Sequence, residues 1–159
     1  MKAATALLLL FLAAPATAEP LAYVTNEVAG TVTILDTATH RVVATVAMTP
    51  AGARPRGIQR TADGKRLYVA LSDLAHLAKG PADAVVALDA HTFKELQRFD
   101  VGTDPERFVV SRDGSRLYSA NEDAGTATVT DIRRNKVIAS LVVGIEPEGV
   151  ALSPDGRWV

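Results

Sequence analysis

The chain has 159 residues, a formal net charge of −1 at pH 7 and no cysteine. Without cysteine it can form no disulfide, no c-type haem attachment and no cysteine-ligated zinc site. A hydrophobic content of 48% with 22% charged residues is typical of a folded domain rather than a disordered chain. The nearly balanced charge gives no general reason to bind nucleic acid or an anionic membrane.

The first eighteen residues have the pattern of an export signal. Lys2 gives a positive start, the segment 3–14 is apolar and rich in leucine, and Ala16-Thr17-Ala18 offers small residues to a signal peptidase. An apolar run of about 12 residues is too short to cross a membrane, and the alternative is a buried helix of the mature domain. We expect cleavage after Ala18, a periplasmic or secreted protein, and no membrane insertion after cleavage.

The remaining chain, residues 19–159, repeats itself. The prolines at equivalent positions lie 50 and 42 residues apart: Pro55, Pro105 and Pro147. The glycines of three Asp-Gly pairs have the same spacings: Gly64, Gly114 and Gly156. The natural period is therefore about 42 residues, and the middle copy carries an insertion.

The repeats predict short antiparallel strands. In the first copy we expect strands over 23–26, 31–36 and 42–46, because β-branched residues alternate with others there. Each copy also contains a strand that enters its Asp-Gly turn, over 58–60, 108–111 and 150–153. Four antiparallel strands in each period of about 42 residues are typical of a β-propeller blade.

The resemblance to a known family rests on particular residues. Tyr23-Val24-Thr25-Asn26 is the tetrapeptide for which the YVTN-repeat β-propellers are named, and segments 121–125 and 146–156 resemble the PQQ-dependent-catabolism-associated subgroup. The resemblance covers the whole mature chain. It implies an all-β propeller of about seven four-stranded blades, of which this chain would be an incomplete N-terminal arc of roughly three.

The expected organisation is a signal peptide over 1–18 followed by a partial propeller over 19–159. Its blades are expected over 22–47 (partial), 55–101, 105–143 and 147–159 (partial). Antiparallel strands place the connections between blades, and those between the second and third strands, on one face. The Asp-Gly turns and the turns after Asp36, Asp89 and Asp131 fall on the opposite face, where we expect little room for a ligand.

Charged residues recur directly after the between-blade proline, as Arg56, Glu106 and Glu148, with Arg107 beside the second. In a closed ring they would gather at one mouth of the channel, where like charges could raise carboxylate pKa values or bind a cation. The alternative is solvated loop charge. The loop 72–83 projects from the same face and is a candidate lid or partner contact, or else a tolerated surface insertion.

Asn26 and Asn121 end equivalent strands at that face. Amide and carboxylate oxygens suit a hard divalent cation beside Glu106 and Glu148, or each asparagine bonds to local backbone. The three histidines, His40, His76 and His91, have no metal-triad spacing. We predict no catalytic residue and no cofactor, with a divalent cation left open.

The function implied by the resemblance is a secreted or periplasmic binding or scaffold module associated with quinoprotein (PQQ-dependent) alcohol or related catabolism. Its partner would be a periplasmic quinoprotein dehydrogenase or a cytochrome, and no nucleic acid. The alternatives are a metal-dependent lactonase-like hydrolase and a haem-carrying redox propeller, although no residue here matches a haem ligand of that family.

Overall fold

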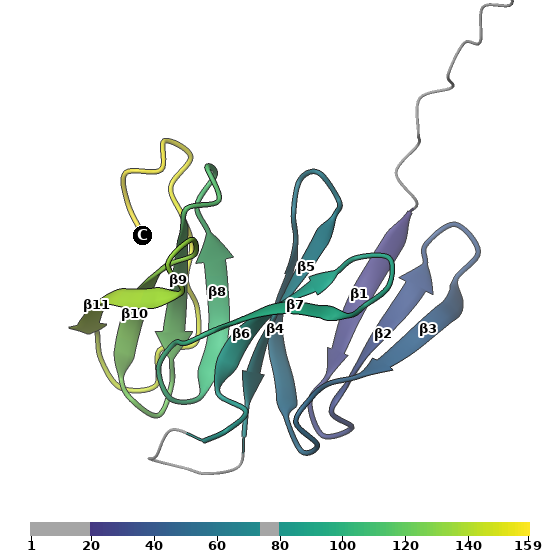
Figure 1. The fold of residues 1–159 in the computed structure, drawn as a ribbon, viewed down its shortest axis with the longest axis horizontal. Coiled ribbons are helices and arrows are strands. Elements are labelled where there is room, and N and C mark those ends of the chain that lie inside the picture. Colours follow the sequence, from purple (N-terminus) through teal and green to yellow (C-terminus); the bar gives the residue numbers. More distant parts are fainter. Residues whose placement is uncertain (1–19, 74–79) are drawn as a thin grey trace, which may run out of the picture.

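The computed structural model describes residues 20–73 and 80–159, which form three antiparallel sheets (Figure 1). The expected signal peptide lies outside the described residues. The first sheet holds β1 (Leu21–Asn26), β2 (Thr31–Asp36) and β3 (Arg41–Ala47). The second holds β4 (Arg54–Arg60), β5 (Arg66–Ser72), β6 (Ala84–Asp89) and β7 (Glu95–Phe99), and the third β8 (Pro105–Val110), β9 (Arg116–Asn121), β10 (Thr126–Asp131) and β11 (Lys136–Val142).

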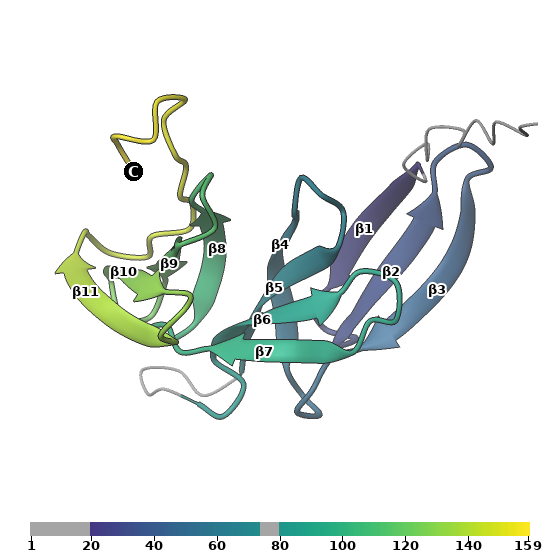
Figure 2. The same ribbon diagram turned by 45° about the horizontal axis from the view of Figure 1, so that its top comes forward.

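The all-β prediction is confirmed, and no helix that could span a membrane occurs in the part of the chain that the structure describes. The sheets stand side by side, each built from consecutive strands (Figures 1 and 2). Strand β4 contacts β1 of the sheet before it and β8 of the sheet after it. This stacking of meandering sheets is the arrangement of propeller blades.

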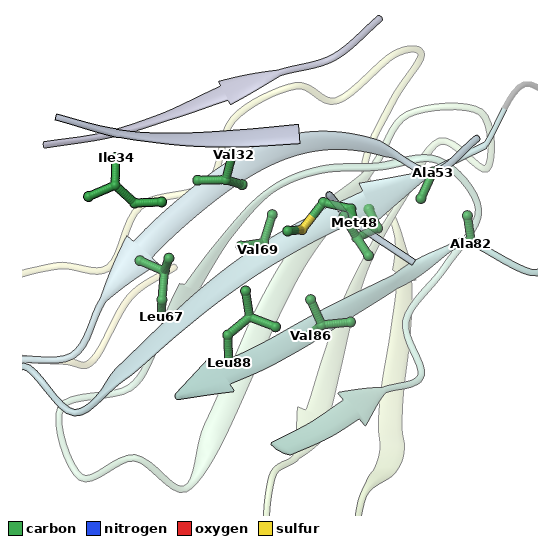
Figure 3. Close-up of a cluster of buried hydrophobic side chains, with 10 residues drawn as sticks. Val32, Ile34, Met48, Ala53, Leu67, Val69, Ala82, Val86 and Leu88 are labelled. Carbon is green, nitrogen blue, oxygen red and sulfur yellow. The ribbon is translucent and has the colours of Figure 1, made fainter. Parts of the chain in front are cut away.

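Two hydrophobic cores hold the three sheets together. Val32 and Ile34 of β2 pack toward β5 and β6 (Figure 3). Successive strand residues point to opposite faces of a sheet, so β5 serves both cores. Leu67, Val69 and Leu71 enter the first core, whereas Tyr68 and Ala70 enter the second. In the second core Tyr68 stacks on Phe99, with ring centroids 6.0 Å apart.

The strand directions define two faces of the molecule, as the sequence predicts. The loop face carries the β1–β2, β3–β4, β5–β6, β7–β8 and β9–β10 connections. Hydrogen bonds join neighbouring loops there, such as Met48 N–H to Gly30 O and Glu122 N–H to Asp104 O. The turn face carries the other connections. There too a hydrogen bond joins neighbouring turns, from Ile132 N–H to Ser115 O.

A β-bulge interrupts both innermost strands at the same repeat position. The register of β4 on β5 shifts between Pro55 and Ile58, and that of β8 on β9 shifts between Pro105 and Phe108. Each shift adds one residue to the inner strand, and such bulges redirect side chains. The first bulge contains Gly57, where a Cβ would lie only 2.8 Å from the carbonyl oxygen of Glu106. Glycine at this position therefore lets β4 approach β8 closely.

One predicted strand is not formed. Residues 150–153 have no strand conformation, although the turn that follows them is complete, with Ser153 N–H bonded to Trp158 O at 2.9 Å. Among the described residues, no strand pairs with this segment. The turn survives because its hydrogen bonds are local.

Candidate functional site

The loop face brings Arg56 and Glu106 into direct contact. Both side chains leave the inner strands at the bulges. Arg56 Nε donates to Glu106 Oε2 at 2.8 Å, and a second guanidinium nitrogen contacts Oε1. The Glu106 side chain is 8% exposed and that of Arg56 18%. A charge-assisted, two-point contact of this kind is geometrically specific, and it joins the second sheet to the third.

Two further carboxylates surround Arg56. Its Nη1 lies 2.8 Å from Glu27 Oε1, and its Nη2 lies 3.9 Å from Glu122 Oε2. Glu27 also accepts a hydrogen bond from Arg54 Nε at 3.1 Å, and this contact holds the pKa of Glu27 below its ordinary value. Arg56 therefore bonds to carboxylates of the first and third sheets at once.

Burial raises the pKa of Glu106 to about 7. Arg56 opposes the rise by hydrogen bonding and charge, whereas Glu122 adds to it because two carboxylates disfavour a second negative charge. A carboxyl group that titrates near neutral pH can take up and release a proton under physiological conditions.

The remaining charged residues of the predicted site lie around this pair. A depression of about 430 Å³ is lined by Arg56, Glu106, Arg107 and Glu148, together with Thr25, Glu27 and residues 55–58. Arg107 and Glu148 are exposed. The predicted residues of the post-proline position are thus gathered at one depression, with Arg56 and Glu106 paired by opposite charge.

The two predicted asparagines are engaged by neighbouring groups. Asn121 is fully buried, and its Oδ1 accepts from Gly102 N–H and Ser119 Oγ–H at 3.0 Å each. Its Nδ2 donates to Thr126 O at 3.2 Å. Asn26 Nδ2 donates to Thr33 Oγ1 at 2.8 Å. Asn121 thus bonds to backbone, as in the alternative that the sequence left open, whereas Asn26 donates to threonine hydroxyls.

Three carboxylates near Arg56 were not selected as site residues from the sequence: Glu27, Asp104 and Glu122. One carboxylate oxygen from each of Asp104, Glu106 and Glu122 lies within 4.8 Å of the others. The repeat contained the signal, because three of its positions are charged in all three copies. They are Glu27, Asp73 and Glu122 after the second strand, Arg54, Asp104 and Glu146 before the proline, and Arg56, Glu106 and Glu148 after it.

The expectation that the turn face has little room is wrong. A depression of about 500 Å³ lies between the β8–β9 and β10–β11 turns, lined by residues 113–116 and 131–134. Asp131 accepts there from Arg116 and Arg134 at 3.2 and 3.1 Å. Two turns set side by side enclose a space that neither turn contains alone.

Among curated proteins, a stretch of 81 residues is 35% identical to dihydro-heme d1 dehydrogenase of Pseudomonas aeruginosa, covering 47% of this chain and 15% of that protein. Antigen Lp49 of Leptospira interrogans is 28% identical over 108 residues, covering 66% of this chain and 23% of that protein. The chain therefore matches less than a quarter of the length of either relative.

Among solved structures, hydrazine synthase of Kuenenia stuttgartiensis is similar with a TM-score of 0.71 and 26% identity, covering 87% of this chain and 37% of that one. The periplasmic gluconolactonase of Pseudomonas aeruginosa shares the fold with a TM-score of 0.63 and 24% identity. The similarity covers 82% of this chain and 38% of the gluconolactonase chain. The family model described as lactonase, 7-bladed beta-propeller matches residues 12–158. With its repeated sheets and this match over most of its length, the chain belongs to the lactonase family of seven-bladed β-propellers.

Proposed function

We propose that this chain is part of an exported propeller that acts as a binding module through its loop face. The observation that carries the proposal is the Arg56–Glu106 pair, which two β-bulges aim into a depression rimmed by the exposed charges of Arg107 and Glu148. Charges of both signs around a partly buried pair suit a polar partner that offers complementary groups.

The partner proposed is a periplasmic quinoprotein dehydrogenase or a cytochrome, in keeping with the resemblance to the PQQ-associated YVTN propellers. The match to a protein named as a dihydro-heme d1 dehydrogenase supports a redox setting. The export pattern of residues 1–18 and the likeness to the periplasmic gluconolactonase of Pseudomonas aeruginosa support a periplasmic or secreted location.

A second candidate is hydrolysis of a lactone, which the family's name suggests. The specific observation in its favour is the pKa of Glu106, about 7, beside the Arg56 guanidinium. Water would attack the lactone carbonyl carbon while Glu106 takes its proton, and Arg56 would stabilise the negative charge on the carbonyl oxygen. The ring C–O bond would then break, and Glu106 would return the proton to the ring oxygen.

To test the proposal, the full-length protein is produced with its leader in a Gram-negative host. We expect periplasmic recovery of a chain that begins at Glu19. Calorimetric titration with the quinoprotein dehydrogenase and the c-type cytochrome of the source organism should give binding to one of them. The pair Glu106→Gln with Glu148→Gln should weaken that binding at least about tenfold, as loss of central charged contacts does.

The matched control is Asp36→Asn with Asp131→Asn on the turn face, which should leave binding unchanged. Binding that fails only in the control pair would place the functional face at the other end of the molecule. Turnover of glucono-1,5-lactone that Glu106→Gln abolishes and Glu148→Gln preserves would favour the hydrolase instead.

A further inference from the structure

We propose that the carboxylates of Asp104, Glu106 and Glu122 bind one Ca²⁺ ion on the loop face, independently of the proposed partner. The three residues come from one blade: the loop before β8, the β8 bulge and the residue that follows β9. One carboxylate oxygen of each lies within 4.8 Å of the other two. Carboxylate oxygens are the ligands that hard divalent cations take.

A second observation points to a ligand at this cluster. Asp104 is only 7% exposed, and its Oδ1 has no hydrogen-bond donor among the residues that the structure describes. A buried carboxylate oxygen that has lost its water without gaining a donor is unfavourable, and such atoms are rare in folded proteins. A cation among the three carboxylates supplies the missing partner.

The charge of the cluster matches a divalent ion. When all three are ionised, Asp104, Glu106 and Glu122 contribute three negative charges, and Arg56 contributes one positive charge to the same group. The neighbouring Glu27 is balanced by its contact with Arg54. Two negative charges therefore remain, and one divalent cation neutralises them, with Arg56 kept on the side of the cluster that faces Glu27.

The coordination habits of the two ions favour calcium over magnesium. Mg²⁺ requires a nearly ideal octahedron and gives up its water reluctantly, whereas Arg56 crowds one side of this cluster. Ca²⁺ also accepts irregular coordination completed by water, which suits a cluster of which Glu106 lines the depression on the loop face.

The test is calorimetric titration of the full chain with CaCl₂ and, separately, with MgCl₂. We expect one Ca²⁺ per chain and weaker binding of Mg²⁺. Asp104→Asn and Glu122→Gln should each raise the Kd for Ca²⁺ by about tenfold or more, which is the scale of lost metal-site contacts. Glu148→Gln is the matched control, because this carboxylate lines the same depression without belonging to the cluster.

Thermal unfolding with CaCl₂ and with EDTA gives a second readout. A bound cation stabilises the native state by mass action, so Ca²⁺ should raise the Tm of the wild-type chain and of Glu148→Gln, and should raise that of Asp104→Asn less at the same concentration. If Asp104→Asn does not fold, the comparison of Ca²⁺ binding between the wild type and Glu122→Gln tests the proposal. Absence of Ca²⁺ binding to the wild type, tighter binding of Mg²⁺, or Ca²⁺ binding unchanged in Glu122→Gln would each overturn the proposal.

Discussion

Glu106 is the residue whose chemistry depends most on its surroundings. Its sequence context, Asp-Pro-Glu-Arg, is that of an ordinary charged loop. In the structure it is 6% exposed, and burial raises its pKa to about 7. The folded chain therefore holds a proton on Glu106 at pH values where the unfolded chain has already released it. Between the two pKa values, rising pH disfavours the folded state through this group.

We expect Glu106→Gln to reveal this linkage. Glutamine resembles the protonated acid, so the free energy of unfolding of the variant, relative to wild type, should increase from about pH 5 to about pH 8. Urea titrations in EDTA at several pH values in that window measure the difference. Glu148→Gln is the exposed control. A pH-independent difference for Glu106→Gln would mean that Glu106 ionises as a solvated carboxylate does.

At the scale of single elements, the Asp-Gly turn is the most regular unit of the chain. In each copy a hydroxyl donates to the turn aspartate at 2.6 Å, from Thr61 to Asp63, Ser111 to Asp113 and Ser153 to Asp155. The aspartate also accepts a backbone N–H two residues ahead, and the glycine that follows it has φ near +70°. Sequence determines this unit because all its bonds are local.

The hydrogen bonds of the Asp-Gly turn predict that the stability of the fold decreases in acid. The Ser111 hydroxyl, with the backbone and hydroxyl of Ser115, lowers the pKa of Asp113 to about 2. A lowered pKa contributes stability above the unfolded pKa, and that contribution is lost as pH falls toward the folded value. We expect Asp113→Asn to be less stable than wild type at about pH 5, and the difference to shrink as pH falls toward 2.

Urea unfolding followed by circular dichroism at pH values across that range measures the effect. Glu148→Gln serves as the exposed control. A difference for Asp113→Asn that stays constant between these pH values would show that the turn does not depend on the ionised carboxylate.

At the scale of the whole molecule, Arg56 connects all three sheets. It stands on β4 of the second sheet and contacts Glu27, which follows β1, and Glu106 of β8. Removing one partner of a largely buried ion pair leaves the other charge without compensation. We expect Arg56→Gln to lower the free energy of unfolding by about 2–3 kcal/mol, below the roughly 3–5 kcal/mol of fully buried pairs, because the Arg56 side chain keeps some exposure.

The matched control is Arg107→Gln, which removes an exposed arginine beside Glu106 and should change stability by no more than about 0.5 kcal/mol. Urea titration near pH 8, where Glu106 is ionised, measures both variants. Equal effects of the two substitutions would contradict the role of Arg56 as the link between sheets.

The sequence by itself determined the features that repeat or are local. Period, strand pattern and Asp-Gly turns together predict an all-β propeller, because alternation of side chains and positive φ at glycine act within a few residues. The post-proline position also identified Arg56, Glu106 and Glu148 as neighbours, since equivalent positions of adjacent blades lie side by side.

Tertiary structure alone decided how these charges combine. The bulges turn Arg56 onto Glu106, and Gly57 permits the close approach of β4 to β8. Glu122 reaches the cluster from the end of another strand, and Asp104 is buried without a donor for its Oδ1 among the described residues. Whether a carboxylate is solvated, paired or raised in pKa depends on burial and on partners far apart in the chain, and a one-dimensional pattern does not contain that information.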